Sequence, residues 1–261
     1  MPLTPQAYPI LEFDPERSAI INPDHHSPPP GLPDRAVLCF FIDLLQQMAE
    51  EGRLVVAYMF GSELGPNPVY RLDTPTGSVL VVHPGVGAPF SAAVLEEVIT
   101  LGADKIIACG GCGLLRPDNP AGHAVVLDSA VGGERGFYHY LPPAREVTAD
   151  PRGIAALEGV LGARGIPFLR GKAWTTDAFY RETPDRRALR IAEGCDVVEM
   201  EAAAFFAVAQ FRGVTFGQVV YGGDLVVPEG WDDRNWDERQ DDRRLMFDVA
   251  VEAALALKPH P

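Results

Sequence analysis

Short apolar runs alternate with helical patterns along most of this chain, and this alternation constrains the fold more than any other feature. The runs are at most seven residues long, which is too short for core helices, and turn residues bound several of them. Strands that alternate with helices form a largely parallel sheet covered on both faces. The expected strands span residues 54–58, 79–82, 105–109, 125–127, 197–200 and 215–221, with another near Phe168.

Helix start and stop signals lie between these runs. Asp34 is placed to cap a helix over residues 35–51, which Gly52 would end. Asp150-Pro151 and Thr183-Pro184 each combine a capping residue with proline at the first helical position. A helix over residues 201–209 is apolar nearly all round and should therefore be buried. The remaining helices are expected over residues 91–101 and 245–257.

The chain divides into an arm and one domain. Residues 1–33 are rich in proline and polar groups, which predicts an irregular N-terminal arm with one short strand at residues 19–21. Residues 34–261 show no internal repeat and no linker, and the short strand belongs with them. The prediction is a single α/β domain with a mixed, largely parallel central sheet and helices on both faces.

Composition excludes several classes of function. The chain has 22 Lys and Arg against 36 Asp and Glu, a net charge of −14, which is unfavourable for binding nucleic acid or an anionic membrane. Its apolar stretches are far shorter than the ~20 residues of a membrane-spanning helix. The N-terminus lacks a basic segment followed by an apolar one, so we expect no secretory signal and a cytoplasmic protein.

The cysteines give little support for a metal or redox site. Cys109 and Cys112 have C-x-x-C spacing, but a metal site would need a second pair of ligands, and Cys39 and Cys195 stand alone. The glycine clusters match neither the dinucleotide pattern nor the P-loop. We therefore expect no metal and no cofactor.

Candidate ligand-binding groups follow four of the expected strands, where open α/β sheets bind ligands. Clustered glycines permit close approach of backbone N–H groups to an anion, although they also occur in ordinary strand-to-helix turns. The four segments are Gly85-Val86-Gly87, Gly110-Gly111-Cys112-Gly113, Glu199-Met200-Glu201 and Gly222-Gly223-Asp224.

Three carboxylates among these segments are candidates for binding a ligand or transferring a proton. Glu199 and Glu201 are two residues apart and would share one face of an extended chain, where they could accept hydrogen bonds from a ribose diol. Asp224 could protonate a leaving group if burial raised its pKa. The alternatives are an acidic first turn of a helix for the glutamates and an Asx turn for Asp224. His25-His26 could contact an anion or a metal, or lie in a solvated loop.

Residues 198–204, with the sequence VEMEAAA, closely resemble the signature of the nucleoside phosphorylase and nucleosidase superfamily. Supporting segments occur in the order that this family has. They are Pro84 to Pro89, Leu101-Gly102 with Ile106 to Gly113, Thr175 to Tyr180, and Gly223-Asp224. The similarity spans roughly residues 19–257.

The resemblance implies an enzyme, a pentosyltransferase that cleaves the N-glycosidic bond of a nucleoside. Asp224 in the matching position favours a purine, which it would protonate as the base leaves. The family's partner is a small-molecule nucleoside, and its members form homo-oligomers, so a dimer or a hexamer built as a trimer of dimers is expected. By the same resemblance Glu201 is catalytic with Asp224, the ribose contacts are Glu199, Met200 and Glu201, and the base contacts are Phe179, Tyr180 and Asp224.

The chain departs from the family at the phosphate site. No arginine occupies the loop aligned at residues 22–27, the position of Ala108 or the region of residues 61–63. The pocket for phosphate or water would then comprise Gly85, Gly87, Gly110, Gly111, Asp24, His25 and His26, with Arg71 or Arg116 as possible additions. Phosphorolysis, with inorganic phosphate as co-substrate, is the main expectation. The alternatives are a phosphate-independent nucleosidase, with Asp24 as a candidate base, and a non-catalytic nucleoside-binding protein.

Trp231 and Trp236 lie in an acidic stretch near the end of the chain. They could form a lid over the pocket, or belong to a plain surface loop.

Overall fold

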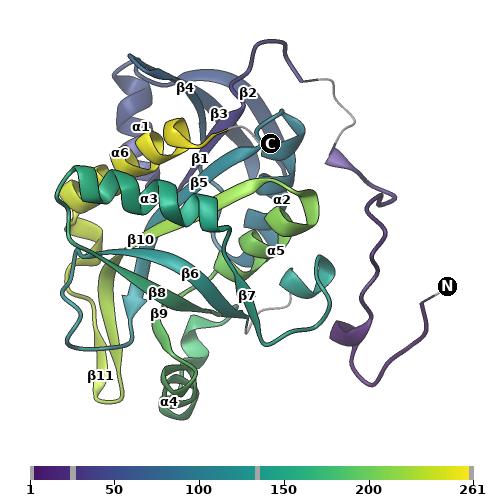
Figure 1. Ribbon diagram of the computed structural model, residues 1–261, viewed down its shortest axis with the longest axis vertical. Coiled ribbons are helices and arrows are strands. Elements are labelled where there is room, and N and C mark those ends of the chain that lie inside the picture. The colour runs from purple at the N-terminus through teal and green to yellow at the C-terminus, as the bar shows by residue number, and fades with distance from the viewer. Residues whose placement is uncertain (1–2, 24–27, 133–135, 259–261) are drawn as a thin grey trace.

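The computed structural model describes residues 3–23, 28–132 and 136–258 (Figure 1). Within these residues a mixed sheet of eleven strands has the order β11-β10-β6-β8-β9-β5-β1-β4-β3-β2, with β7 paired to β6. The strands are β1 (Arg35–Cys39), β2 (Val55–Ser62), β3 (Gly65–Thr74), β4 (Gly77–Val82), β5 (Lys105–Leu114), β6 (Ala124–Gly132), β7 (Glu146–Thr148), β8 (Phe168–Thr175), β9 (Cys195–Glu199), β10 (Thr215–Val227) and β11 (Gly230–Asp232).

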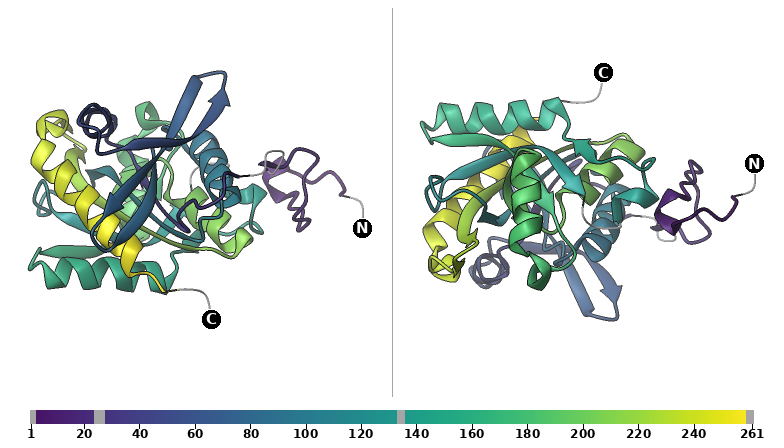
Figure 2. Two further views of the ribbon diagram at one scale, coloured as in Figure 1. Left: turned by 90° about the horizontal axis from the view of Figure 1, so that it is seen from above. Right: turned by 90° about the horizontal axis from the view of Figure 1, so that it is seen from below.

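Helices cover the sheet on both sides, as Figures 1 and 2 show. One pair, α3 and α6, packs against β10, β5 and β1, and a second pair, α2 and α5, packs together elsewhere on the sheet. The helices are α1 (Ile42–Glu50), α2 (Ala88–Thr100), α3 (Pro151–Ala163), α4 (Pro184–Ala192), α5 (Ala202–Arg212) and α6 (Gln240–Ala256), with 3₁₀ turns η1 (Pro9–Leu11), η3 (Gly136–His139), η4 (Phe179–Arg181) and η5 (Trp236–Glu238). The prediction of a single α/β domain with a mixed sheet is confirmed.

Part of the sheet closes on itself. Strand β10 pairs in parallel with β5 and antiparallel with β6, so β5, β9, β8, β6 and β10 form a continuous ring. The ring also contains the antiparallel pair β5–β9, so the sheet is less parallel than the strand–helix alternation alone predicts. Closure brings the ends of β5, β9 and β10 together, and the cavity described below lies there.

Helix α5 is buried along nearly its whole length, as its apolar sequence predicts. Every residue from Ala202 to Ala209 is buried, and Gly213 ends the helix in the left-handed conformation at φ 78°. A buried helix cannot satisfy its first N–H groups with water, so their partners must come from the protein. The Glu199 carboxylate supplies them at the start of α5.

The prediction of a helix over residues 35–51 is wrong for its first part. Residues 35–39 form β1, between β4 and β5, and α1 begins only at Ile42. The run from Ala36 to Cys39 is buried, and a fully buried strand has no alternation that would separate it from a helix.

Two expected turns are also strand. Strand β5 runs through Gly110–Gly113, and β10 runs through Gly222-Gly223-Asp224 with a bulge between Gly222 and Asp224. These two segments pair with each other, because Gly111 is the register partner of Tyr221, Cys112 that of Gly222 and Gly113 that of Asp224. The signal that predicts turns therefore marks the place where two strands approach the cavity.

Residues 19–21 do not form the expected short strand, and Ile20 and Ile21 lie in a bend. Ile20 and Ile21 are highly exposed, and the arm lies beside the body of the molecule in Figures 1 and 2, where no strand pairs with it among the described residues. An apolar run forms a strand only where a neighbour takes its hydrogen bonds. The sequence also did not predict β3, β7 or β11.

No helix among the described residues has the length and apolar character needed to span a bilayer.

Candidate functional site

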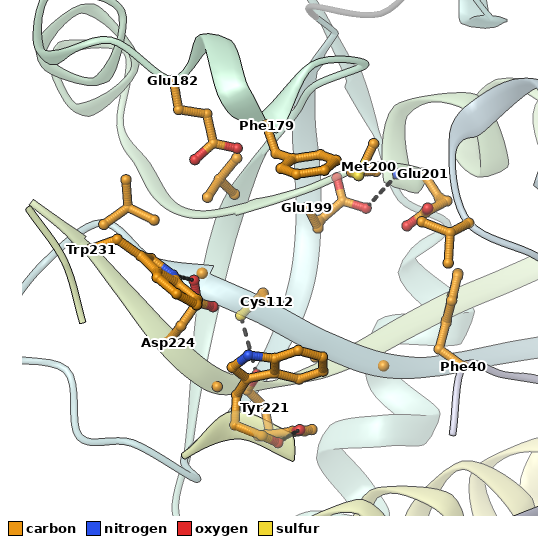
Figure 3. Close-up of a pocket in the computed structure, with 18 of the residues that line it drawn as sticks. Phe40, Cys112, Phe179, Glu182, Glu199, Met200, Glu201, Tyr221, Asp224 and Trp231 are labelled. Atoms are coloured by element: carbon orange, nitrogen blue, oxygen red, sulfur yellow. Dashed lines mark hydrogen bonds between the residues drawn. The ribbon is translucent and has the colours of Figure 1, made fainter. Parts of the chain in front are cut away.

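A cavity of about 900 Å³ lies at the ends of β5, β9 and β10 (Figure 3). Turn η4 and strand β11 contribute to its mouth. It brings together six segments that are far apart in the sequence. Its lining includes Phe40, Phe41, Val86, Gly110–Gly113, Phe179, Tyr180, Glu182, Arg187, Val198–Glu201, Tyr221, Asp224, Trp231, Trp236 and Arg243.

Glu201 is a buried carboxylate at the N-terminus of α5. Its Oε1 accepts a hydrogen bond of 2.5 Å from the backbone N–H of Gly87, which lies 114 residues earlier in the chain. Gly87 has φ 93°, a left-handed conformation that favours glycine. Burial and the neighbouring Glu199 charge raise the pKa of Glu201 to about 8. The structure thus brings Gly87, expected in the anion pocket, against Glu201, expected at the ribose.

Glu199 has protein partners on both carboxylate oxygens. Oε1 accepts from the Thr175 hydroxyl at 2.5 Å, and Oε2 accepts from the backbone N–H groups of Glu201 and Ala202 at 2.8 and 2.7 Å. Burial raises its pKa, and these hydrogen bonds favour the charged form. Glu199 lines the cavity, but its contacts are those of a group that fixes the start of α5.

Asp224 faces the cavity from β10. Its Oδ2 accepts a hydrogen bond of 2.6 Å from the indole Nε1 of Trp231 on β11. Burial raises the pKa of Asp224, which the Trp231 hydrogen bond partly offsets. Figure 3 shows Asp224 and Trp231 on one side of the cavity, with Glu199, Met200 and Glu201 on the other.

Phe179 and Tyr180 come from η4, and both line the cavity. Their ring centroids are 4.1 Å apart. Phe179 is 53% exposed and Tyr180 is 88% exposed, so both rings have face area free for a planar ligand. Figure 3 shows Phe179 above the space between Asp224 and Met200.

Glu182 is a cavity residue that the sequence did not identify as functional. Burial and the charge of Asp224 raise its pKa to about 7. Its carboxylate has no hydrogen-bond or ion-pair partner in the part of the chain that the structure describes. The only sequence signal is its position between the Phe179-Tyr180 pair and the Thr183-Pro184 helix start.

The first strand of the family-like domain ends in aromatic residues. The phosphate loop expected at residues 22–27 would precede β1, and its Asp24, His25 and His26 lie outside the described residues. Phe40 and Phe41 follow β1 directly and line the cavity. A Cβ on Gly110 would lie 3.0 Å from the Phe40 ring, so the ring fills the space beside this glycine.

The other glycines of the expected anion pocket differ in position. Gly111 lines the cavity with Gly110. Gly85 is not among the lining residues. Its N–H donates to Nδ1 of His83, and its φ of 77° shapes the loop that presents Gly87 to Glu201.

Two arginines line the cavity, and both are bound to protein groups. Arg187 donates from Nε to the Val226 carbonyl at 2.6 Å and from Nη2 to the Leu115 carbonyl. Arg243 donates to Asp43 at 2.9 Å and lies 3.4 Å from the Tyr221 hydroxyl.

The arginines that the sequence offered as replacements for the phosphate ligands lie elsewhere. Arg71 pairs with Asp73 at 2.8 Å and Arg116 with Asp196 at 3.0 Å, and neither lines the cavity.

All four cysteines are buried and free. Cys112 lines the cavity, and its Sγ donates to the Tyr221 carbonyl at 3.4 Å. Burial raises the pKa of this thiol, which opposes formation of a reactive thiolate. No cluster of possible metal ligands occurs among the described residues.

The tryptophan segment is part of the cavity wall. Trp231 on β11 and Trp236 in η5 both line it, and the Trp236 carbonyl accepts from the Tyr221 hydroxyl at 3.0 Å. These contacts favour the lid interpretation over a plain surface loop.

Known proteins similar to this chain share both its sequence pattern and its fold. A guanosine phosphorylase from Halorubrum lacusprofundi is 28% identical over 219 residues, which cover 83% of this chain and 82% of that protein. A uridine phosphorylase from Treponema pallidum is 29% identical over 192 residues, 69% of this chain and 73% of that protein. A purine nucleoside phosphorylase from Toxoplasma gondii, solved in complex with immucillin-H, superposes with a TM-score of 0.73 at 22% identity, covering 87% of this chain and 92% of that one.

A family model described as "Phosphorylase superfamily" matches residues 35–257, which begin at β1 and end at the close of α6. The chain therefore belongs to the phosphorylase superfamily.

Proposed function

We propose that this protein cleaves the N-glycosidic bond of a purine nucleoside. The observation that carries the proposal is the placement of Glu201 and Asp224 on opposite sides of one cavity, with Phe179 over the space between them. In such a reaction the sugar develops positive charge as the bond breaks, while the leaving base develops negative charge. A site that binds the sugar at one end and donates a proton at the other stabilises both changes.

Each end has a group suited to its task. Glu201 is buried and its carboxylate is fixed by the Gly87 N–H, so it can accept hydrogen bonds from ribose hydroxyls without reorganising. Asp224 has a raised pKa, which favours the protonated form that can donate to the base. Phe179 offers an exposed ring on which the base can stack.

We infer that water, and not phosphate, attacks the sugar. The cavity wall carries the carboxylates of Glu182, Glu199, Glu201 and Asp224. Its two arginines, Arg187 and Arg243, are already bound to protein carbonyls, a carboxylate and a phenol. A dianion such as phosphate needs free N–H donors or cations, whereas water does not.

Phosphorolysis is the second candidate, because the relatives named above are called phosphorylases. It would require a cation from outside the described cavity wall. The two reactions give different sugar products, so they are separable in one experiment.

The test is incubation of the purified protein with guanosine, inosine, adenosine and uridine, each with and without phosphate. We expect free base and free ribose from a purine nucleoside at a rate that phosphate does not change. Turnover only with phosphate would establish phosphorolysis, and binding without turnover would establish a nucleoside-binding protein.

Glu201→Ala is the matched loss-of-function variant. Loss of the hydrogen bonds between Glu201 and the ribose should lower kcat/KM ~10- to 100-fold. Glu158→Ala, on a helix surface with an Arg170 partner and outside the cavity, is the control and should retain activity.

A further inference from the structure

Glu182 presents an unpaired carboxylate to the cavity opposite Asp224. In Figure 3 its carboxylate points into the space bounded by Phe179 and Trp231. It is partly buried, and no described residue donates a hydrogen bond to it. A partly buried carboxylate without a partner is costly, so a bound ligand that supplies N–H or O–H donors would stabilise it.

The backbone on both sides holds Glu182 in place. Its N–H donates to the Phe179 carbonyl at 3.2 Å, which closes η4. The next residue, Thr183, caps α4 by accepting from the Arg186 N–H at 3.4 Å. One turn later Arg187 ties α4 to the Val226 carbonyl on β10 and to the Leu115 carbonyl after β5. The backbone that carries the Glu182 carboxylate is therefore fixed before any ligand arrives.

The local charges are acidic. Asp224 is the charged group whose field raises the pKa of Glu182, and burial acts in the same direction. Arg181 and Arg186 are close in sequence but exposed, and neither contributes to the pKa of Glu182. Arg187 lines the cavity, but its Nε and Nη2 are bound to carbonyls. No described residue supplies a donor to Glu182, so its donors come from solvent or from a bound ligand.

We propose that Glu182 selects the base by accepting hydrogen bonds from the N1–H and the 2-amino group of a 2-amino-6-oxopurine. This inference rests on the proposed cleavage of a purine nucleoside and adds the identity of its base. Asp224 would then serve the imidazole side of the same ring, where the proton is needed. Glu182 is a specificity-determining residue and takes no part in bond cleavage.

The chemistry of the bases favours guanine among the common ones. An ionised carboxylate has only acceptors, and it is matched by two adjacent N–H donors. Guanine offers such a pair, hypoxanthine offers N1–H alone, and uracil offers N3–H between two carbonyls. Adenine places an acceptor at N1, which an ionised carboxylate would repel. A site built to accept such donors rejects analogues that lack them.

The experiment compares kcat/KM for guanosine and inosine, which differ only in the 2-amino group, for the wild type, Glu182→Gln and Asp185→Asn. Glutamine has nearly the same shape but replaces one acceptor by a donor. We expect the wild type to prefer guanosine and Glu182→Gln to lower the guanosine-to-inosine ratio about 10- to 100-fold, as expected for loss of hydrogen bonds to a charged acceptor. Asp185 is exposed in the first turn of α4 and outside the cavity, so Asp185→Asn should retain the wild-type ratio.

Inhibition of the wild type by free guanine and free hypoxanthine gives an independent measurement, in case Glu182→Gln does not fold. Stronger inhibition by guanine supports the inference. Equal inhibition by the two bases, or an unchanged ratio in a folded Glu182→Gln, would overturn it while leaving the proposed function intact. If no nucleoside is cleaved under any condition, the proposed function fails first.

Discussion

Glu199 and Glu201 are two residues apart, yet their side chains have different partners. Glu199 accepts from Thr175 and from the first N–H groups of α5, whereas Glu201 accepts from Gly87. The sequence predicts that both carboxylates lie at a strand exit, and the structure places both at the cavity. It does not predict their separate roles, because Thr175 and Gly87 are 24 and 114 residues away and only tertiary packing brings them close.

The raised pKa of Glu201 predicts a pH-dependent stability. The pKa is raised from 4.5 to about 8, so between these pH values the folded protein keeps a proton that the unfolded chain has released. The free energy of unfolding should therefore fall as pH rises through this window, by at most about 1.4 kcal/mol per pH unit from this group. Glu201→Gln, which cannot ionise, should show a smaller decline in urea-unfolding midpoints measured from pH 5.5 to 8.

Glu229→Gln is the control for this series, because Glu229 is exposed outside the sheet core. The urea-unfolding midpoint of this variant should fall with rising pH as that of the wild type does. An equal decline in Glu201→Gln and the wild type would show that Glu201 ionises in the folded protein as readily as in the unfolded chain.

The glycines of α3 provide a comparison at the scale of one element. A Cβ on Gly153 would lie 2.4 Å from the Phe216 carbonyl oxygen, because α3 contacts the backbone of β10 there. Gly153→Ala should therefore lower the free energy of unfolding by about 1–3 kcal/mol.

Gly159 lies in the same helix with nothing within 4 Å of an added Cβ. Gly159→Ala should raise stability by about 0.5–1 kcal/mol, since alanine is the better helix former. Thermal unfolding of the two variants measures the difference. Similar shifts in both would contradict the close contact of α3 with β10.

The β10–β11 hairpin brings Trp231 against Asp224 in the cavity wall. Val226 on β10 is the register partner of Trp231 on β11, and the indole N–H binds the Asp224 carboxylate. Trp231→Phe removes the donor that lowers the pKa of Asp224, so that pKa should rise. Because the proposed mechanism needs protonated Asp224, the alkaline decline of kcat should move to higher pH.

Trp236→Phe is the matched control for this hairpin, since its bond to Tyr221 uses the backbone carbonyl and leaves Asp224 untouched. Its pH profile should keep the wild-type alkaline limit. A profile that moves equally in both variants would argue against the indole bond to Asp224.

Most strands and helices could be predicted from apolar patterns and caps, and the failures have physical causes. Strand β1 is buried, so its residues show no alternation that distinguishes strand from helix. Strand β3 begins with Gly65-Pro66-Asn67-Pro68, which reads as a turn, but these residues pair only with β2, where the prolines are tolerated. The role of Glu182 could not be predicted, because it depends on the fold that places it opposite Asp224.

At the scale of the whole molecule, the chain has a net charge of −14, and acidic residues also line the cavity. Four carboxylates line it, and the arginines beside them are bound to protein groups. Among the described residues, the cavity therefore offers an anionic nucleophile no free arginine, and this supports the proposal that water attacks the sugar.

The assembly is a prediction at the same scale. The resemblance to the family predicts a dimer or a hexamer, and β2 exposes the apolar side chains of Val55, Val56 and Met59, with Leu64 beyond it. Light scattering should give a mass that is a multiple of 28.3 kDa. Val56→Asp should lower that mass, and a wild-type monomer at micromolar concentration would contradict the prediction.

The most direct test of the central claim is mass spectrometry of the products formed from guanosine in phosphate buffer. The cavity built around Glu201 and Asp224 predicts guanine and free ribose, with both products formed ~10- to 100-fold more slowly by Glu201→Ala. Ribose 1-phosphate would contradict water as the nucleophile. Intact guanosine, inosine and adenosine after prolonged incubation would contradict cleavage of a purine nucleoside altogether.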